Sequence, residues 1–543
     1  MMPADDLTLS PDTVPGRLQR AAAQQANDAG LCFVDRHERE IEQPWPAIWA
    51  GACRAAGALA ALGVAKGDRV ALLLPTGLEV VRALLGCQLL GAVPFVLAPP
   101  PRLGRLDEYL ARTTAQVQAA GAALMLADAR AHAALAPVVE AASPPLGLHP
   151  ADVVNQGPAF TPGPLDPDAL ALIQYSSGTT VHPKPVALTH RQIIANCDAI
   201  IDRLFAGDAA PVGVYWLPLH HDMGLIGGLL LAICGGRRLV LLPPEAFIAR
   251  PAAWLRALSR HRGTYVAAPN FAYAYSAARV TDAELEGCDL SAWRVAMCGA
   301  EPIAAEVGRR FSARFARFGL PATAFAPVYG LAEATLAVTF APFGRRVFRT
   351  TRVERAALCA NRAVPGDDLD LVSVGQPLSG IAVQIRANGR ACPEGEVGRI
   401  FVQSPGLMAG YFGREDTPIT DGWLDTGDLG VLLDGELYVT GRAKDVVIIR
   451  GQNHMPHEIE EVTSRVPGVR LGRAAAVAEL TDDGERLLLF AETTAPTPEL
   501  AEAIRRAIRA AMGLDPAEVI LLPAGALPRT TSGKIRRGET LRR

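Results

Sequence analysis

The stretch at residues 169–189 carries the first group of side chains that could do chemistry. It reads ALALIQYSSGTTVHPKPVALT, a loop rich in Ser, Thr and Gly that is followed by a lysine between two prolines. Small residues let backbone N–H groups approach a phosphate, while the hydroxyl groups and the lysine supply donors and positive charge. The spacing is not the Walker pattern, and a plain turn is the alternative. The candidates for phosphate contacts are Ser176, Ser177, Gly178, Thr179, Thr180 and Lys184.

Two histidines and an aspartate interrupt an otherwise apolar segment, WLPLHHDMGL, at residues 216–225. A lone histidine in such a place is more often a core residue, but His-His-Asp beside Trp and Gly suits the wall of a pocket. Apolar residues here and at 270–275 favour an apolar substrate. The candidates for substrate contacts are Trp216, His221, Asp222, Met223, Asn270 and Phe271.

Two later turns place small residues and a carboxylate at the ends of predicted strands. CGAEP, at residues 298–302, lies where α/β folds tend to bind ligands, although a simple strand-to-helix turn would also explain it. In YGLAEAT, at residues 329–335, Glu333 follows a Tyr-Gly turn. Its carboxylate could hold Mg²⁺ beside phosphates, because Mg²⁺ prefers oxygen ligands, whereas most isolated glutamates of this kind are solvated.

Charged residues also occur in two segments nearer the C-terminus. WLDTGDLG, at residues 423–430, holds Asp428 in a Thr-Gly turn, where a carboxylate can accept both hydroxyl groups of a ribose. The later Arg442 can pair with a phosphate or with the same ribose, although hairpin turns with solvated charges are the alternative. In the tail LPRTTSGKIRR, at residues 527–537, Lys534 is either a mobile catalytic charge or part of a frayed, solvated end.

Length and composition limit the classes of protein. The chain has 543 residues, too many for one core, so two or more domains are expected. A net charge of −3 gives no basic footprint for nucleic acid or anionic lipid. The N-terminus shows no secretory signal, and glycines and arginines interrupt the most apolar stretch, residues 225–243, so we expect no membrane span. Cysteines without a C-x-x-C pair fit reduced thiols in a cytoplasmic protein rather than a metal cluster.

The elements that must position these groups alternate between strand and helix as far as Phe340. Apolar runs of strand length and segments with helical apolar spacing follow one another, and Gly63 and Gly91 end two of the helices. This alternation predicts a parallel sheet with crossover helices. The expected helices are residues 47–62, 78–90, 106–120 and 193–205, and the expected strands are residues 70–74, 93–97, 170–175, 186–188, 239–242, 265–268 and 294–298.

The pattern changes in the last third of the chain. Residues 341–371 are polar and Arg-rich and give no strong strand signal. Short β segments follow, one of them with the hairpin dipeptide Asp434-Gly435, and predict a small antiparallel unit. From Lys444 the remaining segment is long enough for a separate α+β domain. The expected strands are residues 382–386, 399–403, 431–439, 446–449, 474–478, 487–490 and 519–522, and the expected helices are 457–466 and 498–512.

Taken in order, these stretches resemble the adenylate-forming superfamily of acyl-CoA synthetases, peptide-synthetase adenylation domains and luciferases. The resemblance runs from about Ala47 to Arg537. WLPLHHDMGL, CGAEP, YGLAEATLAVT and RGQNHMPHEIE (residues 450–460) are similar to the versions in the fatty acyl-AMP ligases. Residues 341–372 also look like the insertion that these ligases carry and CoA ligases lack, which is implied to hinder the domain arrangement needed for CoA. A plain connecting loop is the alternative.

The resemblance implies an α/β fold with a large N-terminal domain, residues 1–443, made of α/β subdomains and a small β-barrel-like subdomain. A small mobile α+β domain, residues 444–543, would carry the catalytic lysine and turn about a hinge at Lys444. The implied reaction is ATP-dependent activation of a fatty or similarly apolar carboxylic acid to acyl-AMP, with release of pyrophosphate. Transfer to the phosphopantetheine thiol of an acyl carrier protein would follow.

The family's functional residues carry over to matching positions of this chain. The phosphates would be contacted by Thr179, Thr180 and Lys184, and Mg²⁺ would be held by Glu333 and Thr179. Asp428 would bind the ribose, with Arg442 nearby. The adenine would be framed by Gly299, Ala300, Glu301, Tyr329 and Gly330. Lys534 would bridge the substrate carboxylate and the α-phosphate, and His221 would close the entrance of the acyl pocket.

Two alternatives to an acyl-AMP ligase stay open. The first is an acyl- or aryl-CoA ligase that uses free CoA. The second is a catalytically silent adenylate-binding protein, which Pro185 motivates. Val181 and Pro185 both stand where the family pattern has glycines, but the replacement at Val181 is common among the acyl-AMP ligases. Pro185 in particular stiffens a loop that must move around pyrophosphate.

Overall fold

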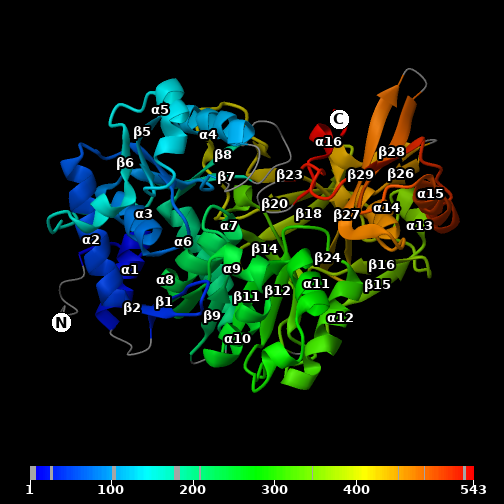
Figure 1. Cartoon of the computed structure of the whole chain (residues 1–543), viewed down its shortest axis with the longest axis horizontal. Coiled ribbons are helices and arrows are strands. Elements are labelled where there is room, and N and C mark those ends of the chain that lie inside the picture. Colours follow the sequence, from blue (N-terminus) through cyan, green and yellow to red (C-terminus); the bar gives the residue numbers. More distant parts are fainter. Residues whose placement is uncertain are drawn as a thin grey trace.

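The computed structural model describes residues 8–24, 29–100, 106–176, 184–206, 210–344, 346–449, 452–481, 484–529 and 534–542. A large N-terminal body and a smaller C-terminal region lie side by side along the long axis of the molecule (Figure 1). Helices and strands alternate in the body, and both parts mix the two kinds of element. The α/β fold class predicted from the sequence is confirmed.

A parallel sheet of four strands forms the first part of the N-terminal body. Its elements are α2 (Trp45–Ala61), β3 (Arg69–Leu73), α3 (Leu78–Leu90), β4 (Val93–Val96), α4 (Leu106–Ala120), β5 (Ala122–Ala127) and β6 (Leu148–Pro150). The strand order is β4-β3-β5-β6. Helix α3 ends at Gly91, whose φ of 72° is the left-handed conformation that glycine adopts readily. The predicted parallel arrangement with crossover helices is therefore present here.

A sheet of nine strands forms the larger part of the body. Its strands are β1 (Gly30–Val34), β2 (Glu40–Pro44), β9 (Val212–Tyr215), β10 (Arg238–Leu241), β11 (Tyr265–Pro269), β12 (Val295–Gly299), β13 (Phe325–Gly330), β14 (Ala337–Phe340) and β17 (Gln376–Pro377). The order is β17-β14-β13-β12-β11-β9-β10-β1-β2. Strands β13 to β1 in this order run parallel, and antiparallel strands close both edges. The carboxyl ends of the parallel strands therefore meet at one edge of the sheet.

The segment predicted to bind phosphate connects two strands, as expected from the sequence. β7 (Leu170–Tyr175) and β8 (Pro185–Thr189) pair antiparallel, and β21 (Gly410–Tyr411) pairs with β8. Thr189 and Gln192 then form a capping box, which starts α6 (His190–Leu204). Residues 177–183 of the loop lie outside the described residues.

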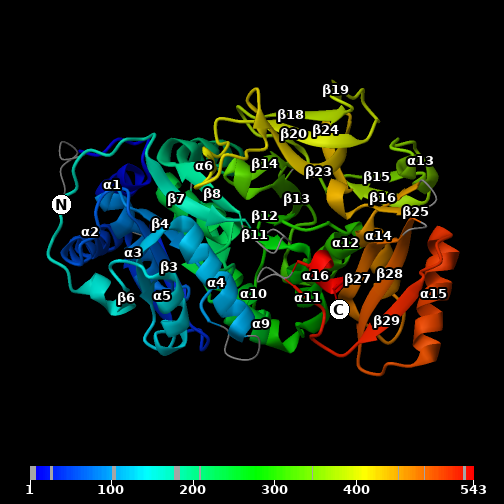
Figure 2. The same cartoon turned by 90° about the horizontal axis from the view of Figure 1, so that it is seen from above.

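A small antiparallel unit follows, which Figure 2 shows in yellow along one side of the molecule. Its strands are β18 (Ala382–Ala387), β19 (Arg390–Ala391), β20 (Gly398–Gln403), β22 (Ile419–Thr420), β23 (Trp423–Leu433) and β24 (Glu436–Arg442). Asp434 and Gly435, with φ of 50° and 71°, form the predicted hairpin turn between β23 and β24. Asp428 lies inside the long strand β23, directly after Thr426 and Gly427, where the strand bulges against β20 and Gly427 has a φ of 76°.

The segment at residues 341–372 contains two strands, although residues 341–371 give no strong strand signal in the sequence. β15 (Thr350–Val353) and β16 (Leu369–Val372) pair antiparallel, and α13 (Arg355–Cys359) lies between them in sequence. Val353, Leu358 and Leu371 of this segment are buried in the apolar cluster that contains Val431 and Tyr438, and Ala363 and Leu369 pack against it half-buried. With so few buried side chains on one face, the sequence shows no apolar run that would indicate strands.

The C-terminal region has its own sheet and apolar core. Its elements are β25 (Val447–Ile449), β26 (Gln452–His454), α14 (Pro456–Ser464), β27 (Val469–Thr481), β28 (Gly484–Thr493), α15 (Pro498–Met512), β29 (Glu518–Leu522) and α16 (Arg537–Thr540). Ile459, Leu489, Ile504 and Ile508 pack together between the sheet and the two longer helices. Lys444 lies in a short 3₁₀ turn, Ala443–Asp445, that leads into this region. In the part of the chain that the structure describes, every helix is too short or too polar to cross a membrane.

Candidate functional site

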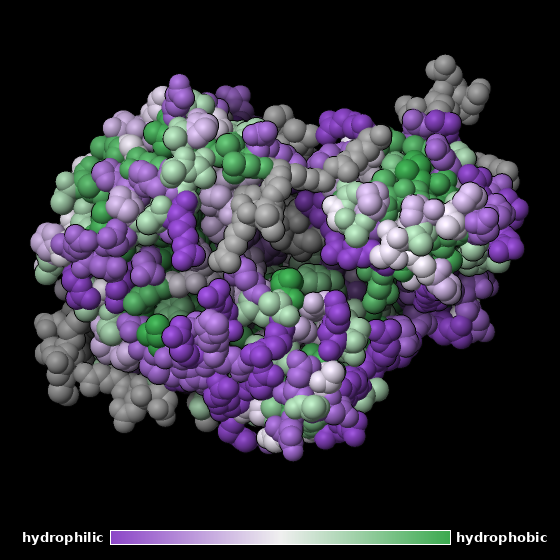
Figure 3. Space-filling view, viewed as in Figure 1, coloured by the Kyte–Doolittle hydropathy of each residue, from purple (hydrophilic) through white to green (hydrophobic). Residues whose placement is uncertain are grey.

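A continuous cleft of about 3120 Å³ lies between the N-terminal body, the antiparallel unit and the C-terminal region. Polar and charged residues border the hollow between the body and the C-terminal region (Figure 3). The cleft collects predicted site residues from segments far apart in the sequence. Those that line it are Ser176, Lys184, Trp216, His221, Asp222, Met223, Asn270, Phe271, Gly299, Ala300, Glu301, Tyr329, Gly330, Glu333, Asp428, Arg442, Lys444 and Lys534. Ser177, Gly178, Thr179 and Thr180 lie outside the described residues.

The nine-stranded sheet brings four of these segments together. Trp216, Asn270 and Ala300 directly follow β9, β11 and β12, and Tyr329 is the penultimate residue of β13. Gly299 is needed for this close packing, because a Cβ there would lie 2.9 Å from Cγ2 of Val328. The segments meet because the carboxyl ends of neighbouring parallel strands share one edge.

Glu301 joins the end of β12 to the helix that follows β11. Its Oε1 accepts a 2.6 Å hydrogen bond from the backbone N–H of Phe271, at the start of α11 (Asn270–Arg279). Burial raises the pKa of Glu301, although this hydrogen bond acts in the opposite direction. The turn CGAEP is thereby fixed against the helix that carries Asn270 and Phe271.

Asp428 is the centre of a buried hydrogen-bonded triad. The hydroxyl of Tyr329 donates to Oδ2 of Asp428 at 2.8 Å, and Nε of Arg442 donates to Oδ1 at 2.9 Å. Asp428 is only 7% exposed, so these two contacts hold the carboxylate in place. Burial and the nearby Asp428 raise the pKa of the Tyr329 phenol, which therefore stays protonated and donates. The triad offers a fixed negative charge and a cation at one end of the cleft.

Tyr411 is a functional candidate that the sequence did not indicate. Its hydroxyl donates to Oε1 of Glu333 at 3.0 Å and lies 3.4 Å from Nζ of Lys184. The Lys184 ammonium also lies 4.6 Å from the centroid of the Tyr411 ring. Burial and Glu333 raise the pKa of the phenol above its usual value. Tyr411 therefore connects the lysine of the phosphate segment to the predicted metal ligand.

His221 and Asp222 lie in direct contact in the wall of the cleft. Nδ1 of His221 lies 2.7 Å from Oδ1 of Asp222. Burial alone would raise the pKa of Asp222, but His221 and, more weakly, Lys534 lower it below its usual value. Asp222 is therefore ionised, and it lines the cleft beside the apolar wall.

Aromatic side chains build this apolar wall. Trp216 stacks on Phe247, with ring centroids 3.9 Å apart and an interplanar angle of 10°, and meets Phe271 edge to face at 6.1 Å. A π-helix, Leu225–Leu230, follows the His-His-Asp motif, and its residue Gly227 lines the cleft. Such a wall suits an apolar ligand beside the charged residues.

Lys534 reaches the cleft from the C-terminal tail. Burial lowers its pKa, while the negative charge of Asp222 acts in the opposite direction. Arg442, Asp428 and Glu301 also act on its charge. Lys534 therefore lines the same cleft as the His221–Asp222 pair and the Tyr329–Asp428–Arg442 triad, near enough for these charges to act on it.

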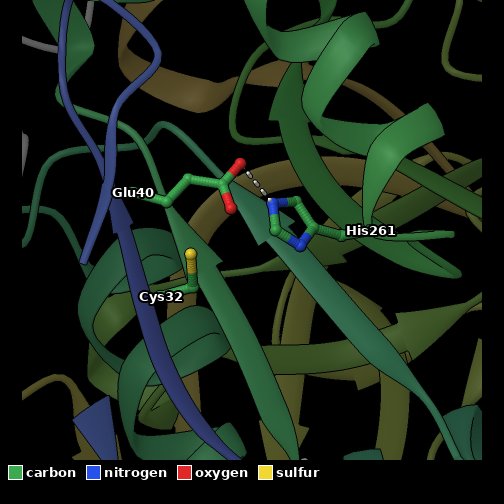
Figure 4. Close-up of side chains that lie close together, drawn as sticks. All are labelled: Cys32, Glu40 and His261. Carbon is green, nitrogen blue, oxygen red and sulfur yellow. Dashed lines mark hydrogen bonds and ion pairs between the residues drawn. The ribbon is translucent and has the colours of Figure 1, made fainter. Parts of the chain in front are cut away.

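Figure 4 shows a second group of potential ligands, Cys32, Glu40 and His261. None of the three lines the cleft. Nε2 of His261 lies 3.2 Å from Oε1 of Glu40, which also receives Nη1 of Arg260 at 2.6 Å. Burial, with a smaller contribution from Glu42, raises the pKa of the Cys32 thiol to about 12. Metal binding needs a thiolate. We therefore assign this group a structural role, in which ion pairs join strand β2 to α10 (Ala252–Arg260).

Comparison with known proteins identifies the family. Residues 18–412 match the family described as AMP-binding enzyme. The chain belongs to this family. The match confirms the resemblance to adenylate-forming enzymes that the motifs predicted.

Individual relatives of the AMP-binding enzyme family match over nearly the whole chain. A medium-chain-fatty-acid–[acyl-carrier-protein] ligase, JamA of Moorena producens, is 36% identical over 506 residues, covering 87% of this chain and 85% of that protein. A structure from a study of fatty acyl-adenylate ligases of E. coli and L. pneumophila has a TM-score of 0.90 at 35% identity, covering 98% and 97% of the two chains. The L. pneumophila ligase in complex with acyl adenylate and pyrophosphate has a TM-score of 0.74 at 30% identity, covering 98% and 96%.

Proposed function

We propose that this protein activates a fatty or similarly apolar carboxylic acid with ATP and passes the acyl group to the phosphopantetheine thiol of an acyl carrier protein. The placement of Lys534 carries this proposal, because it lines one cleft together with the apolar, aromatic wall and the Asp428 triad, and the charges of Asp222 and Asp428 act on its ammonium. The relatives that form or bind acyl adenylates, and the carrier-protein ligase among them, support the same reaction.

The first step joins two anions, so positioning and charge neutralisation carry the catalysis. An oxygen of the substrate carboxylate attacks the α-phosphorus of ATP and forms the acyl–phosphate bond. The bond from the α-phosphorus to the bridging oxygen then breaks, and pyrophosphate leaves with that electron pair. Lys534 would lie against the carboxylate and the α-phosphate, where a compact ammonium on a flexible stem neutralises the charge of both.

The nucleotide would bind across the strand ends and the triad. Gly299, Ala300, Glu301 and Tyr329 would frame adenine, and Asp428 with Arg442 would hold the ribose. Lys184 would contact the phosphates together with the adjoining loop. The remaining carboxylate oxygen of Glu333, beside Lys184, fits Mg²⁺, which takes oxygen ligands and usually binds through one or two carboxylates plus substrate phosphates. When bound there, Mg²⁺ would neutralise phosphate charge.

The acyl chain would lie along the aromatic wall, with Trp216, Met223 and Phe271 as apolar contacts and His221 at the entrance. Apolar surface removed from water contributes roughly 0.8 kcal/mol per buried CH₂ group, so affinity would rise with chain length until the channel is filled.

Tyr411→Phe tests the connection between Lys184 and Glu333. The ring and its contact with the ammonium remain, while the hydroxyl that contacts both residues is lost. We expect the KM for Mg·ATP to rise about fivefold, because a typical hydrogen bond contributes roughly 1 kcal/mol. Steady-state ATP–pyrophosphate exchange would measure this effect. An unchanged KM would show that Tyr411 only fills space.

Pro185 does not argue for a silent protein in this structure. It is the first residue of β8, where a strand tolerates proline, and its carbonyl accepts the N–H of Phe412 at 2.8 Å. The backbone N–H of Ser176 bonds to the carbonyl of Lys184 at 3.1 Å, which closes the base of the loop. Lys184 keeps its direction toward Tyr411 and the cleft.

The separate core of the C-terminal region supports a domain boundary near residues 443 and 444, with Lys444 as the hinge. A few residues of irregular backbone can absorb the change in φ and ψ when a domain turns. We infer that residues 444–543 place Lys534 for adenylation and then rotate to admit the thiol.

Residues 341–372 contact this C-terminal region directly, which supports the implied hindrance of the domain arrangement needed for CoA. Arg355 forms an ion pair with the buried Glu458, and Nδ2 of Asn453 lies 3.3 Å from Oδ1 of Asn361. Sγ of Cys359 lies 3.8 Å from Nδ1 of His454. These contacts would hold the C-terminal domain in the adenylation arrangement.

Arg355→Glu should loosen this contact, because it places two carboxylates together. We expect thioester formation with free CoA to rise about tenfold, while acyl-AMP formation stays within about twofold of the unaltered protein. Arg352→Glu is the matched control, since Arg352 pairs with Asp367 inside the same segment. Equal CoA rates in both variants would refute the restraining role of Arg355.

One experiment separates the proposed function from its alternatives. The protein is incubated with Mg·ATP and a series of fatty acids, then with CoA or a holo carrier protein, and mass spectrometry follows acyl-AMP and thioester. Acyl-AMP that persists with CoA but is consumed by the carrier supports the proposal. Efficient acyl-CoA formation would identify a CoA ligase, and no adenylate with any acid would contradict fatty-acid activation.

A further inference from the structure

An ion pair two residues after Lys534 joins the C-terminal region to the N-terminal body. Nη1 of Arg536 lies 2.8 Å from Oε1 of Glu108, which is in the first turn of α4. The two residues are 428 positions apart, one in the N-terminal body and the other in the C-terminal region. The Arg536 side chain is 18% exposed and that of Glu108 is 43% exposed, so water screens the pair only in part.

The surroundings favour a negative charge at Glu108. The first turn of a helix stabilises an acidic side chain through the unpaired N–H groups and the helix dipole. Arg112, one turn further along α4, adds a second positive charge near Arg536, and burial together with Arg536 lowers its pKa. Without Glu108, the positive charges of Arg112 and Arg536 would therefore oppose each other without the carboxylate that pairs with Arg536.

Fixing Arg536 also fixes the base of the segment that carries Lys534. The backbone N–H of Arg536 bonds to the carbonyl of Pro528 at 3.0 Å, and Arg529 and Ile535 form an antiparallel bridge. Arg536 is further tied to Glu539 of α16 at 3.1 Å. The backbone that follows Lys534 is thus anchored at Arg536, two residues further along the chain.

We propose that Glu108 is a positioning residue for adenylation, which holds Arg536 and thereby keeps Lys534 over the reacting groups. This inference rests on the proposed function and on the rotation of the C-terminal domain. Because rotation separates Arg536 from α4, Glu108 contributes to acyl-AMP formation and not to thioester formation.

The kinetic signature follows from what the ion pair stabilises. It favours the closed arrangement and does not touch the substrates, so its loss lowers kcat and leaves KM for ATP and for the acid unchanged. Glu108→Gln is expected to lower kcat of adenylation about fivefold, the effect of a partly exposed ion pair. Glu108→Arg is expected to lower it at least about tenfold, since it adds repulsion. Added salt should lower the adenylation rate of the unaltered protein by a larger factor than that of Glu108→Gln, because salt screens the ion pair that the variant lacks.

Exchange of the two charges distinguishes positioning from a general structural role. The double variant Glu108→Arg with Arg536→Glu should recover most of the adenylation rate that each single variant loses. Asp107→Arg is the matched control, because Asp107 is exposed on the same turn and forms no ion pair with the C-terminal residues that the structure describes. Thermal unfolding of each variant checks that the fold is intact.

The thioester step is measured separately with synthetic acyl-AMP and holo carrier protein, and all single variants should keep it. An unaltered rate of adenylation in Glu108→Arg overturns the inference, as does an equal loss in both half-reactions or a double variant without recovery. Absence of acyl-AMP with the unaltered protein would instead overturn the proposed function, and this inference with it.

Discussion

Replacing Lys534 by alanine is expected to reduce acyl-AMP formation at least about a thousandfold, which is the largest effect that a single substitution in the cleft should have. Removing one preorganised donor from a site where charge develops costs about 10²–10³ in rate, and Lys534 would act on two anionic groups together. ATP–pyrophosphate exchange measures the loss. The fold should remain intact, because the side chain lies at the cleft and outside the apolar core of the C-terminal region.

Two comparisons make the Lys534 result specific. Arg506→Ala removes a cation from the exposed side of α15 and should leave exchange unchanged. Transfer from synthetic acyl-AMP to a holo carrier protein should persist in Lys534→Ala, because the lysine serves the adenylation arrangement. If exchange in Lys534→Ala matched that of the unaltered protein, the assignment of this lysine would be wrong.

Asp428→Ala should raise the KM for ATP about a hundredfold, equivalent to about 2.7 kcal/mol. The change removes the proposed ribose contact and leaves the Tyr329 hydroxyl and the Arg442 guanidinium without the carboxylate that now accepts from both. Breaking a buried ion pair by deleting one partner is strongly destabilising, so the thermal unfolding temperature should fall as well. Asp428→Asn should give a smaller rise in KM, because an acceptor oxygen remains.

Asp434→Asn is the control for the two Asp428 variants. It makes the same chemical change in the same antiparallel unit, but in the exposed turn between β23 and β24, where asparagine tolerates the φ of 50°. Exchange kinetics of this variant should be those of the unaltered protein. A KM for ATP that did not change in Asp428→Ala would remove the triad from the nucleotide site.

Much of the local structure could be predicted because the chain marks it with local signals. The predicted helices at 78–90, 106–120 and 498–512 have those bounds in the structure. Gly91 ends the first of them in the left-handed conformation, and Thr497 caps the last through the N–H of Leu500. Such signals act within a few residues and can therefore be read without the rest of the fold.

The candidate site was predictable where motifs follow strands of one parallel sheet. The segments after β9, β11 and β12 meet because the topology places their ends at one edge. Tyr411 and Glu108 were not predictable in this way. The proposed role of each residue depends on a partner far along the chain. Tyr411 and Glu333 are 78 positions apart, and Glu108 and Arg536 are 428 positions apart. No local sequence periodicity indicates such pairs.

The pairing of β1 with β10 has a consequence for the order in which the protein can fold during synthesis. β1 and β2 are complete as a hairpin early, but the parallel partner of β1 lies roughly 200 residues later, which at about 5–20 residues per second is a delay of roughly 10–40 s. During that time one edge of the hairpin is open to pairing with other chains. Glu40 and Glu42 on β2 carry like charges that discourage two such hairpins from approaching each other, and they find Arg260 and Arg238 only when the later segment emerges. Nascent chains that stop before Arg238 should therefore be the aggregation-prone intermediates of this protein.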